Sequence, residues 1–515
     1  KFPRGYEGDV AENKTFEVSK ALKIVGGEGA SKPEDITILN GGGVFHTMIV
    51  TTPDKVEIEN LTITGGNAAG ETDFTSEVNG EVYSAKNGGG FYAVAADVAL
   101  KNVTIKSNSG NTAAGAYMVK TAAELENVTV LQNGATGNGG GMMLSECVAT
   151  LKSCTIQGNT AVGISAGLYL YADADKKSEI TLTDCVITKN SSTDNSVGGL
   201  DVRGGSATAD IKAVLNGCTI SENTAPATGK MSGGFRVINA KAEFNDCKIL
   251  NNSATGNGAN LIYEASDVVF NNCLFKGNSA GLGAAIYQYT STAKSTVKVI
   301  GCQFTGNTTA GRGGAIYTRS GHASGSYLYV INSTIDGNKS GSTGSAIALY
   351  GAAATPAEAY VFNSTVIGNT CTRTSATPGG AIGLETAGMK AFVYNSIVSG
   401  NAWAAAPAAA DIYSHASSTY TVCKSVVGTK AFDDAGKEVS GVSFDPATML
   451  SGVNDNSKLT GVYKLTGTGN PALTYGMTVD AVKAVASAYF TDAVIAADQW
   501  GNARSASVMG AYVAQ

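Results

Sequence analysis

The amino-acid sequence predicts an all-β solenoid, a single-stranded parallel β-helix of about a dozen coils with capped ends. Three observations predict it. One segment recurs along most of the chain: an Asn, a second Asn shortly after it and then a Gly-Gly-Ala-Ile-Tyr-like stretch, as in Gly301–Asn307 and Gly313–Tyr317. The copies follow one another at roughly 25–33 residues with no helical spacing, which is typical of stacked coils. The chain also has 65 Gly, 9 Pro and only 15% charged residues, a composition that suits tight turns between short strands.

Charge and hydropathy restrict the partners. The 515 residues carry a net charge of −6 and contain no run of Lys or Arg, so we expect neither a nucleic acid nor an anionic membrane as partner. No apolar run reaches the ~18–20 residues that a bilayer span needs, so we expect no transmembrane span. The chain begins at Lys1 without a charged-then-apolar leader, and we expect that any leader is not present in this chain.

The first strand of each coil shows apolar side chains that alternate with period two, as in Val98–Leu100 and Val297–Val299. An Asn or another small polar residue follows and is expected to make a turn. A short second strand, such as Thr219–Ile220, then ends at a recurrent Asn. Stacked coils would place the amides of these residues one above another, so we expect an asparagine ladder. The ladder residues are Asn108, Asn133, Asn159, Asn190, Asn223, Asn252, Asn278, Asn307, Asn338, Asn369 and Asn401.

The third strand follows a variable loop that ends in Gly-Gly, and its first inward position is expected to be large and apolar. These positions are Phe91, Tyr117, Met142, Leu168, Leu200, Phe235, Leu261, Ile286, Ile316, Ile347, Ile382 and Ile412. The neighbouring positions, among them Met118, Lys120, Ile262 and Glu264, are then expected to face outward.

Six of the nine Cys occupy one slot of the repeat: Cys154, Cys185, Cys218, Cys247, Cys273 and Cys302. Leu61, Val103 and Val128 fill this slot in earlier coils, and Ser333, Ser364 and Ser396 fill it in later ones. The exchange with small or apolar residues indicates inward-facing filler rather than redox chemistry. Since no two Cys have the spacing of a metal site, we expect buried thiols and no metal.

The repeat divides the chain into three predicted segments. Residues 1–59, with Leu22–Gly27 and Ile36–Leu39, are expected to form an N-terminal cap with irregular first coils. Residues 60–430 form the repeats. Residues 431–515 lose the recurrent Asn, contain an Ala/Val-rich helical stretch near Val479–Ala488 and are expected to close the C-terminal end.

Packing fixes the inward residues, so a functional site must use outward positions or loops. The outward positions of the third strand carry Tyr, Arg, Glu and Asp in the middle and later coils. Aromatic rings stack on sugar rings, and the Arg guanidinium makes paired hydrogen bonds to hydroxyls or uronates. This stripe is therefore predicted to contact a polysaccharide or a host-surface glycan. The predicted ligand-binding residues are Tyr169, Tyr171, Tyr287, Tyr289, Tyr317, Arg319 and Tyr350. The same residues also suit a strand as plain decoration.

An enzyme is the alternative from a different class. A polysaccharide lyase that acts on an acidic glycan needs a basic residue near an acidic cluster, and Asp201, Arg203, Arg236 and Glu264 could supply them. Glycoside hydrolysis needs two facing carboxylates, and the outward positions offer few close acid pairs. No cofactor is expected. A structural spacer without ligand or activity is the third functional hypothesis.

The paired signals Phe304–Asn307 and Gly313–Ile316 resemble the repeats of chlamydial polymorphic outer membrane proteins and of right-handed parallel β-helix surface proteins of gut Bacteroidetes. The resemblance covers roughly residues 60–430. Tyr463–Leu465, Asn470–Ala472, Asp498–Arg504 and Gly510–Tyr512 are similar to the closing segment of many such proteins. The resemblance implies a right-handed β-helix, a secreted or outer-surface location and an adhesin-like, non-catalytic role.

Overall fold

The computed structural model describes residues 7–9, 15–27, 37–68, 74–75, 80–194, 197–226, 232–375, 377–467, 469–504 and 507–512. The chain divides into two compact units, Lys1–Ala242 with Asn252–Gly256, and Glu243–Asn251 with Asn257–Gln515. Much of the predicted N-terminal cap, including Ile36, lies outside the described residues.

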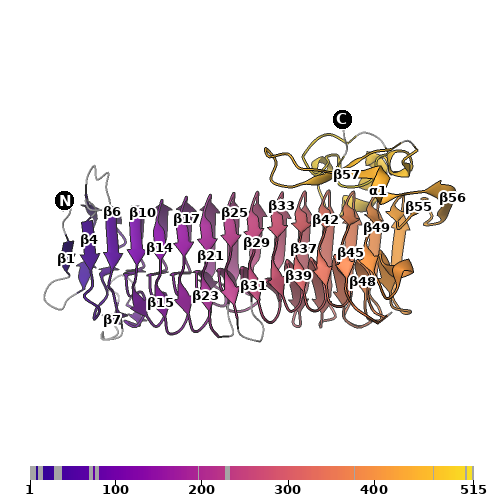
Figure 1. Cartoon of the computed structure of the whole chain (residues 1–515). Coiled ribbons are helices and arrows are strands. Elements are labelled where there is room, and N and C mark those ends of the chain that lie inside the picture. Colours follow the sequence, from indigo (N-terminus) through magenta and orange to yellow (C-terminus); the bar gives the residue numbers. More distant parts are fainter. Residues whose placement is uncertain are drawn as a thin grey trace. The chain divides into compact units, whose positions relative to one another are not determined.

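One coil of the first unit shows how its coils are built (Figure 1). Four strands follow one another: β13 (Ala122–Glu126), β14 (Thr129–Leu131), β15 (Gly134–Ala135) and β16 (Met142–Ser145). Each pairs in parallel with its equivalent in the next coil, β17 (Val148–Lys152), β18 (Thr155–Gln157), β19 (Thr160–Ala161) and β20 (Leu168–Ala172). The coils therefore stack into parallel sheets. We call them the long sheet (β13 and β14 types), the short sheet (β15 type) and the face sheet (β16 type).

The other strands of the first unit repeat this plan. The long sheet has β1 (Glu7–Asp9), β3 (Leu22–Val25), β4 (Thr37–Asn40), β6 (Lys55–Thr64), β10 (Asp97–Lys106), β21 (Lys177–Thr183), β22 (Val186–Thr188), β25 (Asp210–Asn216) and β26 (Thr219–Ser221). The short sheet has β11 (Ser109–Gly110), β23 (Ser191–Ser192), β27 (Thr224–Ala225) and β31 (Ser253–Ala254). The face sheet has β2 (Phe16–Val18), β5 (Met48–Val50), β9 (Phe91–Val94), β12 (Ala116–Val119), β24 (Leu200–Gly204) and β28 (Phe235–Ile238). An antiparallel pair, β7 (Phe74–Thr75) and β8 (Val82–Tyr83), branches from this plan.

The second unit is built in the same way. Its long sheet has β30 (Lys248–Leu250), β33 (Asp267–Asn271), β34 (Leu274–Lys276), β37 (Ser295–Ile300), β38 (Gln303–Thr305), β41 (Ser326–Ile331), β42 (Thr334–Asp336), β45 (Ala357–Phe362), β46 (Thr365–Ile367), β49 (Lys390–Tyr394), β50 (Ile397–Ser399), β53 (Thr419–Cys423) and β54 (Val426–Val427). Its short sheet has β35 (Ser279–Ala280), β39 (Thr308–Thr309), β43 (Lys339–Ser340), β47 (Thr370–Cys371) and β51 (Ala402–Trp403). Its face sheet has β32 (Asn260–Tyr263), β36 (Ile286–Thr290), β40 (Ile316–Ser320), β44 (Ile347–Tyr350), β48 (Ile382–Leu384) and β52 (Ile412–Ser414). The strand β29 (Lys241–Asn245) contains the sequence boundary between the units, and a 3-10 helix, η3 (Pro407–Ala409), precedes β52.

The turn inside the long sheet explains the first recurrent Asn. Asn102, Asn127 and Asp184 adopt φ of 53°, 53° and 52° there, a left-handed conformation that Asn and Asp tolerate better than other non-Gly residues. The side chains also bond from coil to coil, because Nδ2 of Asn127 donates to Oδ1 of Asn102 at 2.8 Å. We call this row of residues the turn ladder.

The predicted asparagine ladder is confirmed at the second recurrent Asn. In the first unit, the backbone N and Nδ2 of each ladder residue from Asn108 to Asn223 donate to Oδ1 of the next one at 2.9–3.1 Å. The second unit repeats the arrangement from Asn278 to Asn401 at 2.8–3.0 Å. Because these amides are buried, the ladder satisfies polar groups that burial would otherwise penalise and holds the coils in register.

The Cys slot is buried, as the sequence predicts. The six side chains are at most 2% exposed, and none of the described Cys residues forms a disulfide. The thiols donate to backbone carbonyls, as from Cys185 Sγ to Leu151 O at 3.4 Å and from Cys273 Sγ to Phe244 O at 3.3 Å. Burial raises the pKa of the Cys273 thiol well above its ordinary value, so this thiol stays protonated and inert.

The predicted strand phase is correct in most coils and wrong in the coil of β12. Tyr117 pairs with Tyr92 and Met143 and faces outward with them. Ala116 and Met118 instead fill the inward positions and are fully buried. Lys120, predicted to face outward from the strand, lies beyond its end at φ 51°. The prediction failed because it required a large inward residue, whereas the small Ala116 occupies the slot.

The same one-residue error occurs in the coil of β32. Leu261, predicted to face inward, pairs with the outward Tyr287. Asn260 and Ile262 take the inward positions, and Asn260 Nδ2 donates to Ala285 O at 2.7 Å. The predicted strand phase was wrong by one residue here because a polar residue, Asn260, occupies the inward position. Glu264, predicted to face outward from the strand, lies at the turn after it, at φ 55°.

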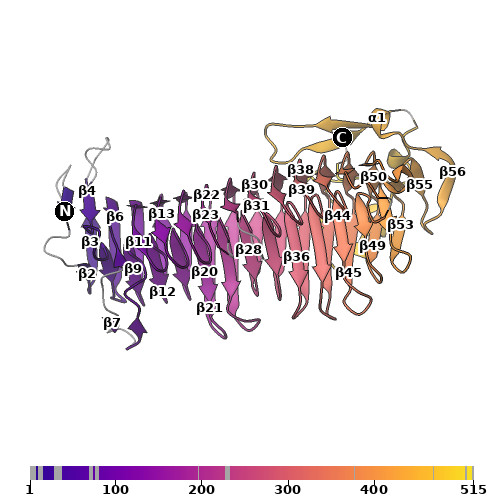
Figure 2. The ribbon, with the colours of Figure 1, turned by 60° about the horizontal axis from the view of Figure 1, so that its bottom comes forward.

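The closing segment, residues 430–512, packs against the later coils of the second unit (Figure 2). It contains β55 (Lys430–Phe432), β56 (Glu438–Ser443), α1 (Pro446–Met449), β57 (Leu450–Val453), β58 (Val462–Leu465), the 3-10 helix η4 (Pro471–Leu473), α2 (Val479–Ala486) and α3 (Asp492–Ile495). The predicted helical stretch near Val479–Ala488 is α2.

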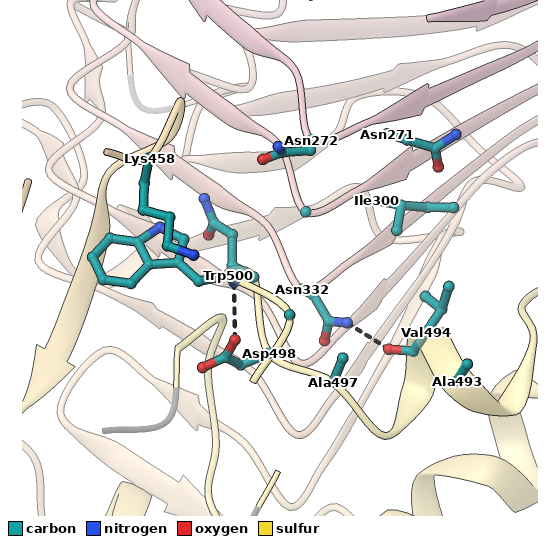
Figure 3. Close-up of a pocket in the computed structure, with 13 residues that line it drawn as sticks. Asn271, Asn272, Ile300, Asn332, Lys458, Ala493, Val494, Ala497, Asp498 and Trp500 are labelled. Atoms are coloured by element: carbon teal, nitrogen blue, oxygen red, sulfur yellow. Dashed lines mark hydrogen bonds between the residues drawn. The ribbon is translucent and has the colours of Figure 1, made fainter. Parts of the chain in front are cut away.

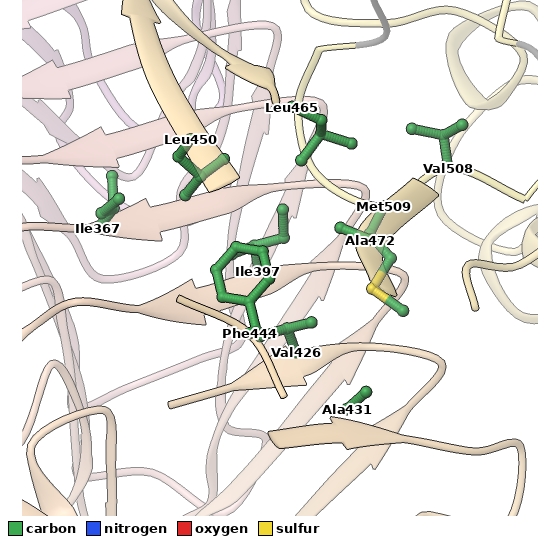
Figure 4. Packing of buried hydrophobic residues seen from close by; sticks show 10 residues of the cluster. All are labelled: Ile367, Ile397, Val426, Ala431, Phe444, Leu450, Leu465, Ala472, Val508 and Met509. Atoms are coloured by element: carbon green, nitrogen blue, oxygen red, sulfur yellow. The ribbon is translucent and has the colours of Figure 1, made fainter. Parts of the chain in front are cut away.

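Two apolar clusters hold the closing segment in place. Phe444, Leu450 and Met509 belong to a buried cluster with Ile367 and Ile397 of the long sheet (Figure 4). A second cluster joins residues of α2 and α3 to Tyr329, Ile331 and Phe362. The segment therefore covers part of the outer surface of the long sheet in the second unit and creates a surface that the repeats alone do not have.

Candidate functional site

The first outward position of the face sheet is covered rather than open. In the first unit, Tyr169 is 4% exposed and packs in a cluster with Ala113 and Met143, since the loop before the strand folds over it. Tyr171, two residues further, is half-buried, and its ring centroid lies 5.7 Å from that of Tyr169. Of these two predicted ligand residues, Tyr171 is the more accessible.

Two residues of the lyase alternative, Asp201 and Arg236, are paired with each other. Arg236 Nε donates to Asp201 Oδ1 at 3.0 Å and Arg236 Nη2 donates to Asp201 Oδ2 at 2.6 Å, with both side chains buried. This bidentate pair neutralises the two charges and joins β24 to β28. Arg203, two residues along β24 from Asp201, is half-buried.

Glu264 belongs to the second unit and holds a turn. Its carboxylate accepts hydrogen bonds from Ser291 N at 3.0 Å, Ser291 Oγ at 2.8 Å and Thr292 Oγ1 at 2.6 Å. Burial by itself would raise the pKa of Glu264, but these hydrogen bonds outweigh it and lower the pKa below its ordinary value. An ionised, hydrogen-bonded carboxylate of this kind stabilises a loop and is a poor general base.

The structure brings together the predicted ligand residues of the later coils. The rings of Tyr287 and Tyr317 stack with centroids 4.8 Å apart and planes 11° apart, and both are 2% exposed. Closer to the solvent than these two buried rings, the Arg319 guanidinium carbon lies 4.7 Å from the Tyr289 ring centroid and 5.5 Å from that of Tyr350. Arg319 Nη1 also donates to Tyr287 Oη at 3.5 Å.

Two further residues complete this group and were not predicted. Arg312, from the loop before β40, forms a bidentate ion pair with Glu385, which follows β48. The Arg312 guanidinium carbon also lies 5.1 Å from the Tyr350 ring centroid. Because 73 residues separate the paired side chains, no local sequence signal identifies them. We call the seven residues Tyr287, Tyr289, Arg312, Tyr317, Arg319, Tyr350 and Glu385 the Tyr/Arg cluster.

The Tyr/Arg cluster combines a cation with aromatic rings at a partly exposed surface. Tyr289, Arg319 and Tyr350 are half-buried, so their edges and the Arg319 charge reach the solvent. Burial raises the pKa of Tyr287 above its ordinary value, so its hydroxyl remains a hydrogen-bond donor even at alkaline pH. The carboxylate of the cluster, Glu385, is bound by Arg312. These groups can donate hydrogen bonds to hydroxyls or carboxylates and present rings to an apolar sugar face.

The comparisons with known proteins agree with the fold. The family model described as a right-handed beta helix region matches residues 144–332. Together with the parallel pairing of coils, this match makes the fold a right-handed parallel β-helix. No curated protein matches the chain.

Two further properties bear on the class of site. None of the helices in the described part of the chain has the length and apolarity that a membrane span requires. The described residues contain no group of three or more His, Cys, Asp or Glu side chains that could hold a metal ion.

Proposed function

We propose that this protein is a secreted or outer-surface, non-catalytic β-helix that contacts glycan through the Tyr/Arg cluster. The observation that carries the proposal is the position of Arg319 between the rings of Tyr289 and Tyr350, at a partly exposed surface of the face sheet. Surface location and adhesin-like behaviour belong to this proposal and follow from the resemblance described above.

The affinity is expected to depend on the length of the glycan. Each aromatic contact in a shallow, wet site contributes on the order of 1 kcal/mol, so short sugars should bind weakly. Polymers should bind more tightly, because neighbouring sugar units can engage the same face repeatedly.

A glycan array that includes neutral and acidic polysaccharides tests the proposal with the full chain. Binding that is lost in Tyr289→Ala or Tyr350→Ala supports it. Tyr420→Ala is the matched control, because Tyr420 is 49% exposed and lies on a strand of the long sheet, outside the cluster. Binding unaffected by both cluster variants contradicts the proposal.

The same panel separates the alternatives. Release of unsaturated uronides would establish a polysaccharide lyase, although the mutual pairing of Asp201 and Arg236 weighs against it. No binding and no turnover across the panel would favour a structural spacer.

A further inference from the structure

A pocket opens between the closing segment and the long sheet of the second unit (Figure 3). Its volume of about 420 Å³ lies in the range of ~300–1,000 Å³ that small-molecule sites occupy. Asn271, Asn272 and Ile300 line it from the long sheet, and Val494 lines it from α3. Trp500 and Lys458, from two loops of the closing segment, line the opposite side.

A glycine in the turn ladder makes room for this pocket. Gly301 occupies the position of the turn ladder between Asn272 and Asn332. It shares the left-handed conformation of these residues, with φ of 65°. A Cβ at Gly301 would meet Gln499 O first, at 3.4 Å, which is an ordinary contact. The absent side chain therefore leaves a hollow that a longer residue could fill.

The missing side chain also leaves an acceptor available. At other positions of the turn ladder an Asn Oδ1 accepts from Nδ2 of the next coil, as Asn363 Oδ1 does from Asn395 and Asn102 Oδ1 does from Asn127, at 2.8 Å each. Asn332 Oδ1, in another residue that lines the pocket, has no hydrogen-bond partner within the described part of the chain. Asn272 Nδ2 donates to Asp246 Oδ1 at 2.6 Å, but Gly301 has no Nδ2 to donate to Asn272 Oδ1. The half-buried Asn272 therefore offers a carbonyl acceptor to the pocket.

The opposite wall supplies a fixed aromatic ring and a positive charge. Trp500 Nε1 donates to Thr460 O at 2.8 Å, and the ring packs edge-on against Tyr512 with centroids 4.9 Å apart. Lys458 Nζ lies 5.9 Å from the Trp500 ring centroid and forms no ion pair with an acidic side chain among the described residues. The nearby Asp498 carboxylate is occupied, because Oδ1 accepts from Trp500 N and Asn502 N at 2.9 Å each.

We propose that this pocket binds a single acidic pyranose unit, a uronate. The apolar face of the sugar would lie on the Trp500 ring, a ring hydroxyl would donate to Asn272 Oδ1 and the carboxylate would pair with Lys458. The inference is independent of the Tyr/Arg cluster, because the two sites share no residue.

Isothermal titration calorimetry of the full chain with methyl β-D-glucuronide and methyl β-D-glucoside tests this inference. The glucuronide should bind about tenfold more tightly, the advantage expected of one charge-assisted contact. Lys458→Met should abolish the difference. Tyr420→Ala, outside both the pocket and the Tyr/Arg cluster, should leave glucuronide binding unchanged.

Gly301→Asn is the sharpest variant. Asn tolerates the left-handed turn, and its side chain would extend the turn ladder into the pocket, so glucuronide binding should disappear while the melting temperature stays equal or rises. If this variant fails to fold, the selectivity of Lys458→Met for glucuronide over glucoside still tests the inference. Absent glucuronide binding, equal affinity for both glycosides, unchanged selectivity in Lys458→Met or unchanged binding in a folded Gly301→Asn variant would each overturn the inference.

Discussion

The guanidinium of Arg236 donates hydrogen bonds to both carboxylate oxygens of Asp201 across adjacent strands of the face sheet, at 3.0 and 2.6 Å. Asp201 is fully buried and Arg236 is 6% exposed. Removal of one partner from such a pair leaves an uncompensated buried charge, whereas replacement of both partners by apolar residues is far milder.

We therefore expect Asp201→Ala to lower the free energy of unfolding of the first unit by about 3–5 kcal/mol. The double variant Asp201→Leu with Arg236→Met should lose much less. Urea denaturation followed by circular dichroism compares them. Equal losses in the single and double variants would show that the cost comes from packing and not from the unpaired charge.

The core of the second unit gives a second prediction. Ile316 is fully buried and lies between Ile286 and Ile347 in the parallel register. Ile316→Asp would bury an unpaired carboxylate and should destabilise by several kcal/mol, on the order of 3 or more. The exposed Lys339→Asp is the matched control. A melting temperature of Ile316→Asp equal to that of the control would contradict the inward orientation.

The buried Cys slot predicts a particular thiol titration. In native protein, the six slot thiols should resist Ellman's reagent because they are buried. In unreduced protein unfolded with guanidinium, all six should react. Oxidised slot thiols in freshly purified protein would mean that the coils are cross-linked and that the filler interpretation is wrong.

The Glu264 turn predicts a pH dependence. Because the folded-state pKa is lowered relative to the ordinary value of 4.5, the carboxylate contributes stability above that value, and this stability is lost as the pH falls through the folded-state pKa. Glu264→Gln should therefore lower the melting temperature at pH 7, and the difference from the parent should shrink towards pH 3. A difference that is constant across this range would rule out the charge as its cause.

Much of the fold could be predicted from the sequence, because its determinants are local and repeated. The second recurrent Asn predicted the ladder, and the exchange of Cys with Val and Ser predicted an inert slot. The predicted inward and outward alternation was wrong in the two face-sheet strands where Ala116 and Asn260 stand in place of a large inward residue. Those two exceptions could not be located from the sequence, because a large residue one position further on fits the repeat equally well. A shift of one residue exchanges the two faces of a strand.

The candidate sites were harder to predict, because tertiary contacts make them. Tyr317 stacks on Tyr287, which accepts a hydrogen bond from Arg319, but the sequence did not show that both rings are buried. The Arg312–Glu385 pair and the pocket beside Trp500 join residues that are distant in the sequence. The pocket has one weak signal in the sequence, Gly301 in a row that is mostly Asn and Asp. Gly217 and Ser153 occupy the same turn in other coils, so the meaning of Gly301 depends on the position of the closing segment.

The most direct test of the proposed glycan contact is a titration of the parent chain, Arg319→Ala and Tyr420→Ala with the best polysaccharide from the array. Loss of the Arg319 charge between two rings should weaken binding about tenfold, with little change in melting temperature, while Tyr420→Ala should bind like the parent. A folded Arg319→Ala variant that binds as tightly as Tyr420→Ala would contradict the account.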